Sequence, residues 1–95
     1  MKQEQLEAFL ASVSATVGEQ GWHEVAAEQH ITLYAGHDGV GLTVGKVEAI
    51  QIEGDQLRAR TRKGETYLLA LSDVFATAVE APKNNERKAG FAADR

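Results

Sequence analysis

The sequence has no cysteine, few aromatic residues and no long hydrophobic run, and each absence removes a class of protein. Without cysteine in its 95 residues, the chain forms neither disulfides nor thiolate metal sites, so its stability must come from an apolar core, enlarged or not by self-association. No charged segment followed by an apolar one begins the chain, and no apolar run reaches the roughly 18 residues of a membrane span. We therefore expect a cytoplasmic protein with no membrane partner.

Positive charge is scarce over most of the chain. Residues 1–81 hold six Lys and Arg against twelve Asp and Glu, which gives −6, whereas residues 82–95 hold four against two, which gives +2. General attraction to nucleic acid or to an anionic membrane needs a clustered basic surface. The acidic body argues against such binding.

The residues that are present suffice for one small globular domain. With 43% hydrophobic and 25% charged residues, the chain can fold around a single thin core. We expect one α+β domain over residues 1–81 and a flexible polar tail over residues 82–95, where Phe91 is the only large apolar residue.

An amphipathic helix is predicted from Gln3 to Val17. Its apolar residues recur at intervals of three and four positions, which places them on one helix face: Leu6, Phe9, Leu10, Val13 and Val17. Gly18 and Gly21 follow, and glycine readily takes the left-handed conformation that ends a helix. We expect this helix to pack on a sheet.

The rest of the domain is predicted to form a bent antiparallel sheet of five or six strands. His30 to Ala35 alternates apolar and polar residues, as a half-buried strand does. Trp22 to Ala27 is ambiguous between a strand and a helical turn, and we assign it as a strand. Phe75 to Val79 stays open between the same two alternatives, and Ser72-Asp73 before it is typical of a cap or a tight turn.

Asp38-Gly39 indicates a two-residue hairpin turn, because both central positions of such turns favour positive φ. The register that follows pairs Leu33 with Val44 and Ala35 with Leu42. The apolar faces of the two strands then agree.

Val40 to Ile52 is too long for one flat strand, and the parity of its apolar residues changes along it. A bend at Gly45 and a β-bulge near Glu48 would explain both features. Gly54-Asp55 is the next predicted turn, and it would set Ile52 opposite Leu57 and Ile50 opposite Ala59.

Two registers compete at the hairpin that follows. A two-residue Lys63-Gly64 turn would mix charged and apolar side chains on one face. A three-residue loop with Gly64 as a bulge glycine instead pairs Leu57 with Leu69 and Ala59 with Tyr67. We favour the second register because it keeps one face apolar.

Arg58, Arg60 and Arg62 then share the opposite face, since side chains of a strand alternate sides. Their spacing of about 7 Å is close to that of phosphates on an extended nucleic-acid strand, and Lys63 adds a fourth cation at the turn. The competing interpretation is a solvated or subunit-contact face, with Gln51, Glu48 and Glu65 as neighbours. Few aromatic residues lie beside the row to stack bases.

Three histidines, His23, His30 and His37, recur every seven residues and raise the hypothesis of a metal site. Gly36 and Gly39 exclude one continuous helix through them, so His23 and His30 could face each other only across a tight turn at Glu28-Gln29. Surface histidines are the favoured interpretation, and we predict neither a metal site nor a cofactor.

No nucleophile stands beside a base at an informative spacing. The segment from Gly36 to Gly41 lacks the Lys-Ser/Thr ending of a phosphate-binding loop and lies between two predicted strands. We therefore expect a protein that is not an enzyme.

The order of elements over roughly residues 3–80 resembles the Sm-like small β-barrels, which include bacterial RNA chaperones that assemble into rings. The likeness is most detailed in Gly45-Lys46-Val47-Glu48-Ala49-Ile50 and in the segment from Tyr67 to Val74. Other SH3-like barrels, such as PRC-barrel domains, share the same order. The resemblance implies a helix followed by a curled five-stranded barrel. The Arg-Gly loop and the Tyr-Lys-His segment of that family are not present, so no binding residue is carried over.

These observations together predict a non-catalytic protein-interaction or assembly module that associates with itself or with a protein partner. The strand count is high for so short a chain, and a meander leaves strand edges that need covering. The alternative is a nucleic-acid-binding barrel that uses Arg58, Arg60 and Arg62.

Overall fold

The computed structural model describes residues 1–81, so the polar tail predicted for residues 82–95 lies outside the described residues. Within residues 1–81, one α-helix, seven strands and two 3₁₀ turns follow one another: α1 (Gln3–Ser12), β1 (Thr16–Val17), η1 (Glu19–Gly21), β2 (Trp22–Glu24), β3 (His30–His37), β4 (Val40–Glu53), β5 (Gln56–Thr61), β6 (Thr66–Ala70), η2 (Leu71–Asp73) and β7 (Val74–Glu80). No helix among these residues is long and apolar enough to cross a membrane.

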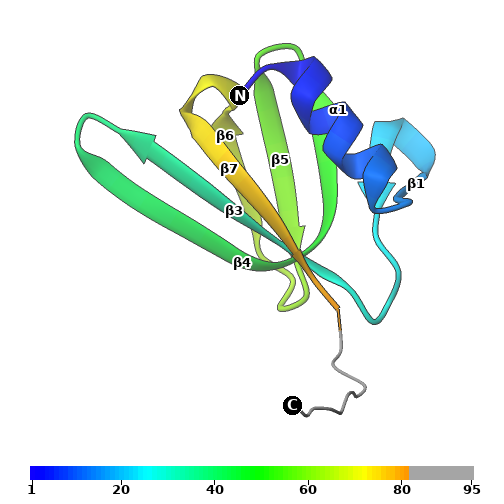
Figure 1. Cartoon of the computed structure of the whole chain (residues 1–95). Coiled ribbons are helices and arrows are strands. Elements are labelled where there is room, and N and C mark those ends of the chain that lie inside the picture. The colour runs from blue at the N-terminus through cyan, green and yellow to red at the C-terminus, as the bar shows by residue number, and fades with distance from the viewer. Residues whose placement is uncertain (82–95) are drawn as a thin grey trace, which may run out of the picture.

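The seven strands form one antiparallel sheet that curls into a half-barrel, with α1 packed on it (Figure 1). The long strand β4 organises the sheet, because it pairs with β2, β3 and β5. Within residues 1–81, β6 pairs only with β5 and β7 pairs only with β3. The α+β class is therefore confirmed, and the half-barrel is compatible with a small β-barrel.

Beyond the body of the sheet, the β3–β4 hairpin extends as an arm, seen at the left of Figure 1. Its turn has the expected conformation, with φ of 52° at Asp38 and 81° at Gly39. The predicted register is confirmed, because Leu33 lies opposite Val44 and Ala35 opposite Leu42.

The bend in β4 is also confirmed. The register between β4 and β5 shifts between Val47 and Ala49, which leaves Glu48 as the extra residue of a bulge. Ile50 then pairs with Ala59 and Ile52 with Leu57, as the apolar pattern requires. Because of this bend, one strand takes part in both halves of the curled sheet.

The β5–β6 hairpin adopts the register that keeps one face apolar. Leu57 pairs with Leu69 and Ala59 with Tyr67, while Gly64 has a φ of 90°. Thr61 N–H donates to the carbonyl oxygen of Glu65 at 2.8 Å and closes the loop.

The predicted helix is wrong only in its last third, residues 13–17. α1 ends at Ser12, because Ser14 takes the left-handed conformation with φ of 60° and Ala15 N–H donates to the Leu10 carbonyl oxygen at 3.0 Å. Val17, which the periodicity placed on the apolar face of the helix, lies in β1 and is 62% exposed.

The two glycines expected to end the helix instead shape the β1–β2 hairpin. Gly18 N–H donates to the Trp22 carbonyl oxygen at 2.7 Å, and Gly21 has a φ of 78°. This small hairpin adds the strand that brings the total to seven rather than five or six.

The two ambiguous segments both contain strands. Trp22–Glu24 is a strand, which confirms the first part of the 22–27 assignment, and Val74–Glu80 is β7. Ser72 and Asp73 belong to the 3₁₀ turn η2, so the tight turn expected there is present.

The core lies between the two halves of the curled sheet and is closed by α1. Leu6 and Leu10 are the buried residues of α1. The largest fully buried side chains join helix and sheet in one cluster: Leu6, Leu10, Ile31, Leu33, Ile50, Leu57, Val47 and Val74. Burial of these side chains supplies the main stabilising free energy of the domain.

Candidate functional site

The predicted row of arginines lies on β5, on the side of the strand opposite the core. Arg58 pairs with Leu68 of β6 and Arg60 with Thr66, as expected from the favoured register. Between them, Ala59 and the neighbouring Leu57 are fully buried. The alternation of β5 therefore separates the core from a charged outer face.

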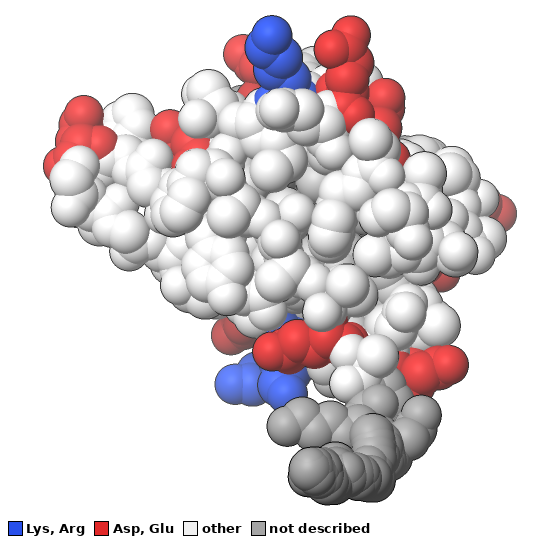
Figure 2. All heavy atoms as spheres, in the orientation of Figure 1, with Lys and Arg blue, Asp and Glu red and all other residues white. Residues whose placement is uncertain are grey.

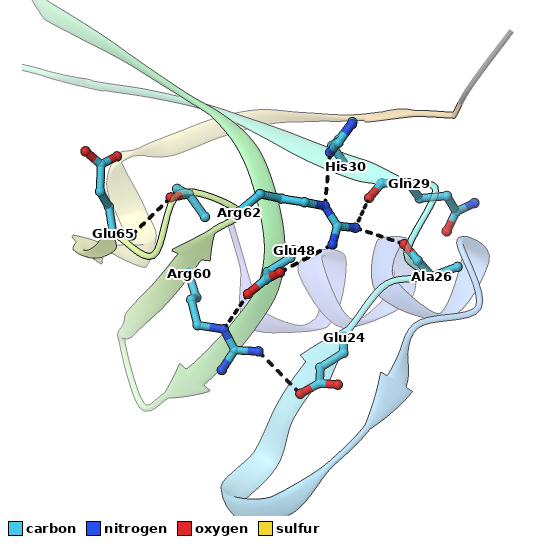
Figure 3. A network of polar contacts seen from close by, with 9 residues as sticks. Glu24, Ala26, Gln29, His30, Glu48, Arg60, Arg62 and Glu65 are labelled. Carbon is cyan, nitrogen blue, oxygen red and sulfur yellow. Dashed lines mark hydrogen bonds and ion pairs between the residues drawn. The ribbon is translucent and has the colours of Figure 1, made fainter.

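Glu48, the bulge residue of β4, joins two of these arginines. Arg60 Nε donates to Glu48 Oε2 at 2.9 Å, and Arg62 Nη1 donates to Glu48 Oε1 at 3.3 Å (Figure 3). The Glu48 side chain is only 29% exposed. The bulge thus adds a carboxylate on the outer face, where it bridges two guanidinium groups.

Arg60 also contacts β2. Its Cζ lies 5.1 Å from the centre of the Trp22 ring, within the range of a cation–π interaction. Its Nη2 lies 3.4 Å from Glu24 Oε2, which makes Glu24 the second carboxylate beside this arginine. Trp22 and Glu24 occupy alternate positions of the same strand, so both side chains reach the same side of the sheet.

Arg62 holds the segment that connects β2 to β3. Its Nη2 donates to the carbonyl oxygens of Gln29 at 2.6 Å and of Ala26 at 3.0 Å. Its Nε donates to His30 Nδ1 at 3.3 Å. Figure 3 shows these groups converging on one guanidinium.

Arg58 contacts two side chains of the adjacent strand β4. Its Nη1 donates to Glu53 Oε1 at 2.7 Å and to Gln51 Oε1 at 2.8 Å. Gln51 in turn donates to the Gln20 carbonyl oxygen at 2.8 Å, which links the row to the β1–β2 hairpin.

Lys63, the fourth predicted cation, is exposed at the β5–β6 turn and has no ion pair with any residue from 1 to 81. It lines a groove of about 230 Å³ together with Lys46, Thr43, Glu65 and Tyr67. Lys63 therefore lies in a different environment from the three arginines, although all four residues are close in sequence.

These contacts change what the arginine row can do. Each guanidinium already has a carboxylate partner, so the local charge is close to balanced, and a polyanion would have to compete with Glu24, Glu48 and Glu53. Planar guanidinium groups suit such multiple contacts better than an ammonium would. The arrangement stabilises the position of β2 and of the 25–30 connection against the bend in β4.

The histidines do not converge. His23 lies on β2 opposite Ile50 of β4, whereas His30 and His37 lie at the two ends of β3. His37 Nδ1 lies 3.0 Å from Asp73 Oδ1 of η2, and the His37 side chain is 71% exposed. No group of three His, Cys, Asp or Glu residues within the described range could hold a metal ion.

A second surface feature is apolar. Tyr34 of β3 and Phe75 of β7 place their ring centres 6.5 Å apart, and Phe75 is 69% exposed. On the other face of the arm, a groove of about 140 Å³ lies between Leu42, Val40 and Leu69. Sequence reasoning missed the Tyr34–Phe75 pair, although the uncharged run from Val74 to Val79 was a signal for it.

Comparison with protein-family models, with curated proteins and with solved structures finds no match to this chain. The structure itself shows a curled antiparallel sheet that is compatible with a small β-barrel.

Proposed function

We propose that this protein is a non-catalytic interaction or assembly module that associates with copies of itself. The observation that carries the proposal is the open half-barrel. Within residues 1–81, β6 and β7 each have a hydrogen-bonded neighbour on one side only. Such edges present backbone donors and acceptors that proteins usually cover or pair.

Exposed apolar side chains support the same proposal. Four of them lie on the arm and on the edge strands β6 and β7, on more than one face of the sheet: Val40 at 70%, Leu42 at 44%, Leu68 at 57% and Phe75 at 69% exposure. Single exposed apolar residues are normal on a monomer. Their position on or beside strands with a free edge supports a contact with another chain.

The polar groups of the described residues favour binding over catalysis. His37 and Asp73 form a His–carboxylate pair, but His37 is 71% exposed at the end of the arm. Catalytic acid–base pairs normally work in sites that exclude water. The Sm-like order of elements, which belongs to ring-forming proteins, also favours assembly.

Size-exclusion chromatography with light scattering tests the proposal on the full chain. We expect an average mass above the 10.3 kDa of one chain at concentrations of tens of micromolar, and it should rise toward twice that value as the concentration is raised, because interfaces of modest area are weak and reversible. A strictly monomeric mass across this range would refute self-association.

Nucleic-acid binding by Arg58, Arg60 and Arg62 is the alternative function, and a binding assay at several salt concentrations tests it. Binding through phosphates weakens steeply with salt, and loss of a phosphate contact lowers that slope. We expect no measurable affinity for single-stranded RNA at low salt, because Glu24, Glu48 and Glu53 compete for the same guanidinium groups.

A further inference from the structure

One side of the half-barrel is almost free of charge. Figure 2 shows that the surface over β7 and the arm carries no charged side chain in its centre, while Lys, Arg, Asp and Glu gather at its margins. The side chains that face outward here are uncharged, because Tyr34 of β3 pairs with Ala76 of β7 and with Thr43 of β4. The neighbouring outward pair on the arm is Gly36 with Gly41.

A β-bulge adds an aromatic ring to this neutral face. The register between β3 and β7 shifts where Tyr34 pairs with Ala76 and Ala35 pairs with Val74, so Phe75 is the extra residue. Val74 stays fully buried, while Phe75 is 69% exposed. Its ring lies over Gly36, where an added Cβ would be 3.6 Å from Phe75 Cε2. The bulge thus turns a large apolar side chain outward without opening the core.

The charge of the rest of the body indicates what this face can bind. Residues 1–81 carry −6, so a polyanion is repelled, and a basic partner would be drawn to the acidic margins rather than to the neutral centre. A second copy carries the same negative charge. It can approach most closely where neither copy presents charge, and a twofold axis would bring identical faces together.

We propose that the outer face of β7, β3 and the arm, centred on Tyr34 and Phe75, is the contact between two copies of this chain. This inference rests on the proposed self-association and specifies its surface. Phe75 of each copy packs on the small residues of the other, where Gly41 and Ala76 leave room for a ring. Aromatic side chains are enriched at interface centres, where charged residues are depleted.

The area of this face indicates how tightly two copies are expected to bind each other. The eight residues of β3 span roughly 26 Å, and three strands cover roughly 15 Å across. The resulting area of roughly 400 Å² is about half of what each partner contributes to a standard interface. We therefore expect a reversible dimer with a dissociation constant in the micromolar range.

Sedimentation analysis of the wild type, of Phe75→Asp and of Val17→Asp tests the inference. Val17 is a matched control, because it is apolar, 62% exposed and on β1, at the opposite end of the sheet order from β7. Both variants add one negative charge. We expect Phe75→Asp to raise the dissociation constant at least about 30-fold, since a charge buried in a contact of this size remains without a partner, and Val17→Asp to change it less than about threefold.

The thermal melting curve of each variant shows whether it still folds. Phe75→Ser provides a second, neutral variant at the same site, and we expect it to weaken the dimer while leaving the melting temperature close to that of the wild type. A wild-type dimer that is equally stable in Phe75→Asp and Phe75→Ser would overturn this surface and leave self-association intact. A wild-type monomer, with the face left to a different protein, would overturn both proposals.

Discussion

Glu48 is the residue whose replacement tests the arginine network most sharply. Its two carboxylate oxygens accept hydrogen bonds from Arg60 at 2.9 Å and from Arg62 at 3.3 Å. Glu48→Gln keeps the shape and one acceptor but removes the charge, which leaves two guanidinium groups on neighbouring outward positions without their shared partner. Charge-assisted hydrogen bonds contribute about 1.5–3 kcal/mol when buried, and exposed ion pairs about 0.2–1 kcal/mol.

The exposure of these groups places the expected loss between those limits. Glu48 and Arg62 are each 29% exposed and Arg60 is 37% exposed, so water screens part of the interaction. We expect Glu48→Gln to lower the free energy of unfolding by about 1–2 kcal/mol. For a domain of this size, that corresponds to a melting temperature lower by about 5–15 °C.

Glu53→Gln is the matched control. Glu53 pairs with one arginine, Arg58 at 2.7 Å, and its side chain is 68% exposed. Its loss is expected to cost at most about 0.5 kcal/mol. Thermal unfolding followed by circular dichroism measures both variants under the same conditions. Equal melting temperatures for the two variants would show that Glu48 does not fix β2 and the 25–30 connection against β4.

Three other predictions test the turns, the corrected helix and the charge balance of the arginine row. Gly64→Ala is expected to destabilise the protein by about 1 kcal/mol or more, since Gly64 has a φ of 90°, whereas Gly45→Ala, with open space and no positive φ, should be nearly neutral in urea unfolding. Leu6→Ala should cost about 2–5 kcal/mol because Leu6 is 0% exposed, and Val17→Ala, at 62% exposure, should leave the urea midpoint nearly unchanged. Replacing all three arginines of the row with Ala should lower the melting temperature while RNA affinity in a filter-binding assay stays undetectable.

The hairpin registers were predictable because turn chemistry and apolar alternation agree along β3, β4 and β5. Asp38-Gly39 and Gly64 fix the loop lengths, and an apolar face permits only one register beside each. The bulge at Glu48 was visible as a change of parity within a segment too long for a single strand. Local chemistry determines these features, so the sequence reveals them.

The end of the helix was not predictable from periodicity. Val13 and Val17 continue the spacing of the helix face, but the left-handed conformation at Ser14 ends α1 before Val17. Serine has only a modest tendency toward that conformation, so the sequence favoured the glycines further on. The tertiary pairing of β1 with β2 outweighs helix propensity here.

The partners of the arginines were only partly predictable. Glu48 and Gln51 lie on the adjacent strand and were expected as neighbours. The contact of Arg60 with Glu24 spans 36 residues along the chain and depends on β2 pairing with the second half of β4. No local pattern encodes that pairing, because Trp22–Glu24 has only three residues.

The central claim is that copies of this acidic protein meet at a neutral surface, and the salt dependence of association tests it most directly. Raising the ionic strength from about 0.01 M to about 0.15 M shortens the screening length from about 30 Å to about 8 Å. Repulsion between two bodies that each carry −6 over residues 1–81 then weakens. We predict that the dimer dissociation constant, measured by sedimentation equilibrium, falls as salt rises. A dissociation constant that rises with salt would show that ion pairs hold the copies together and would contradict the claim.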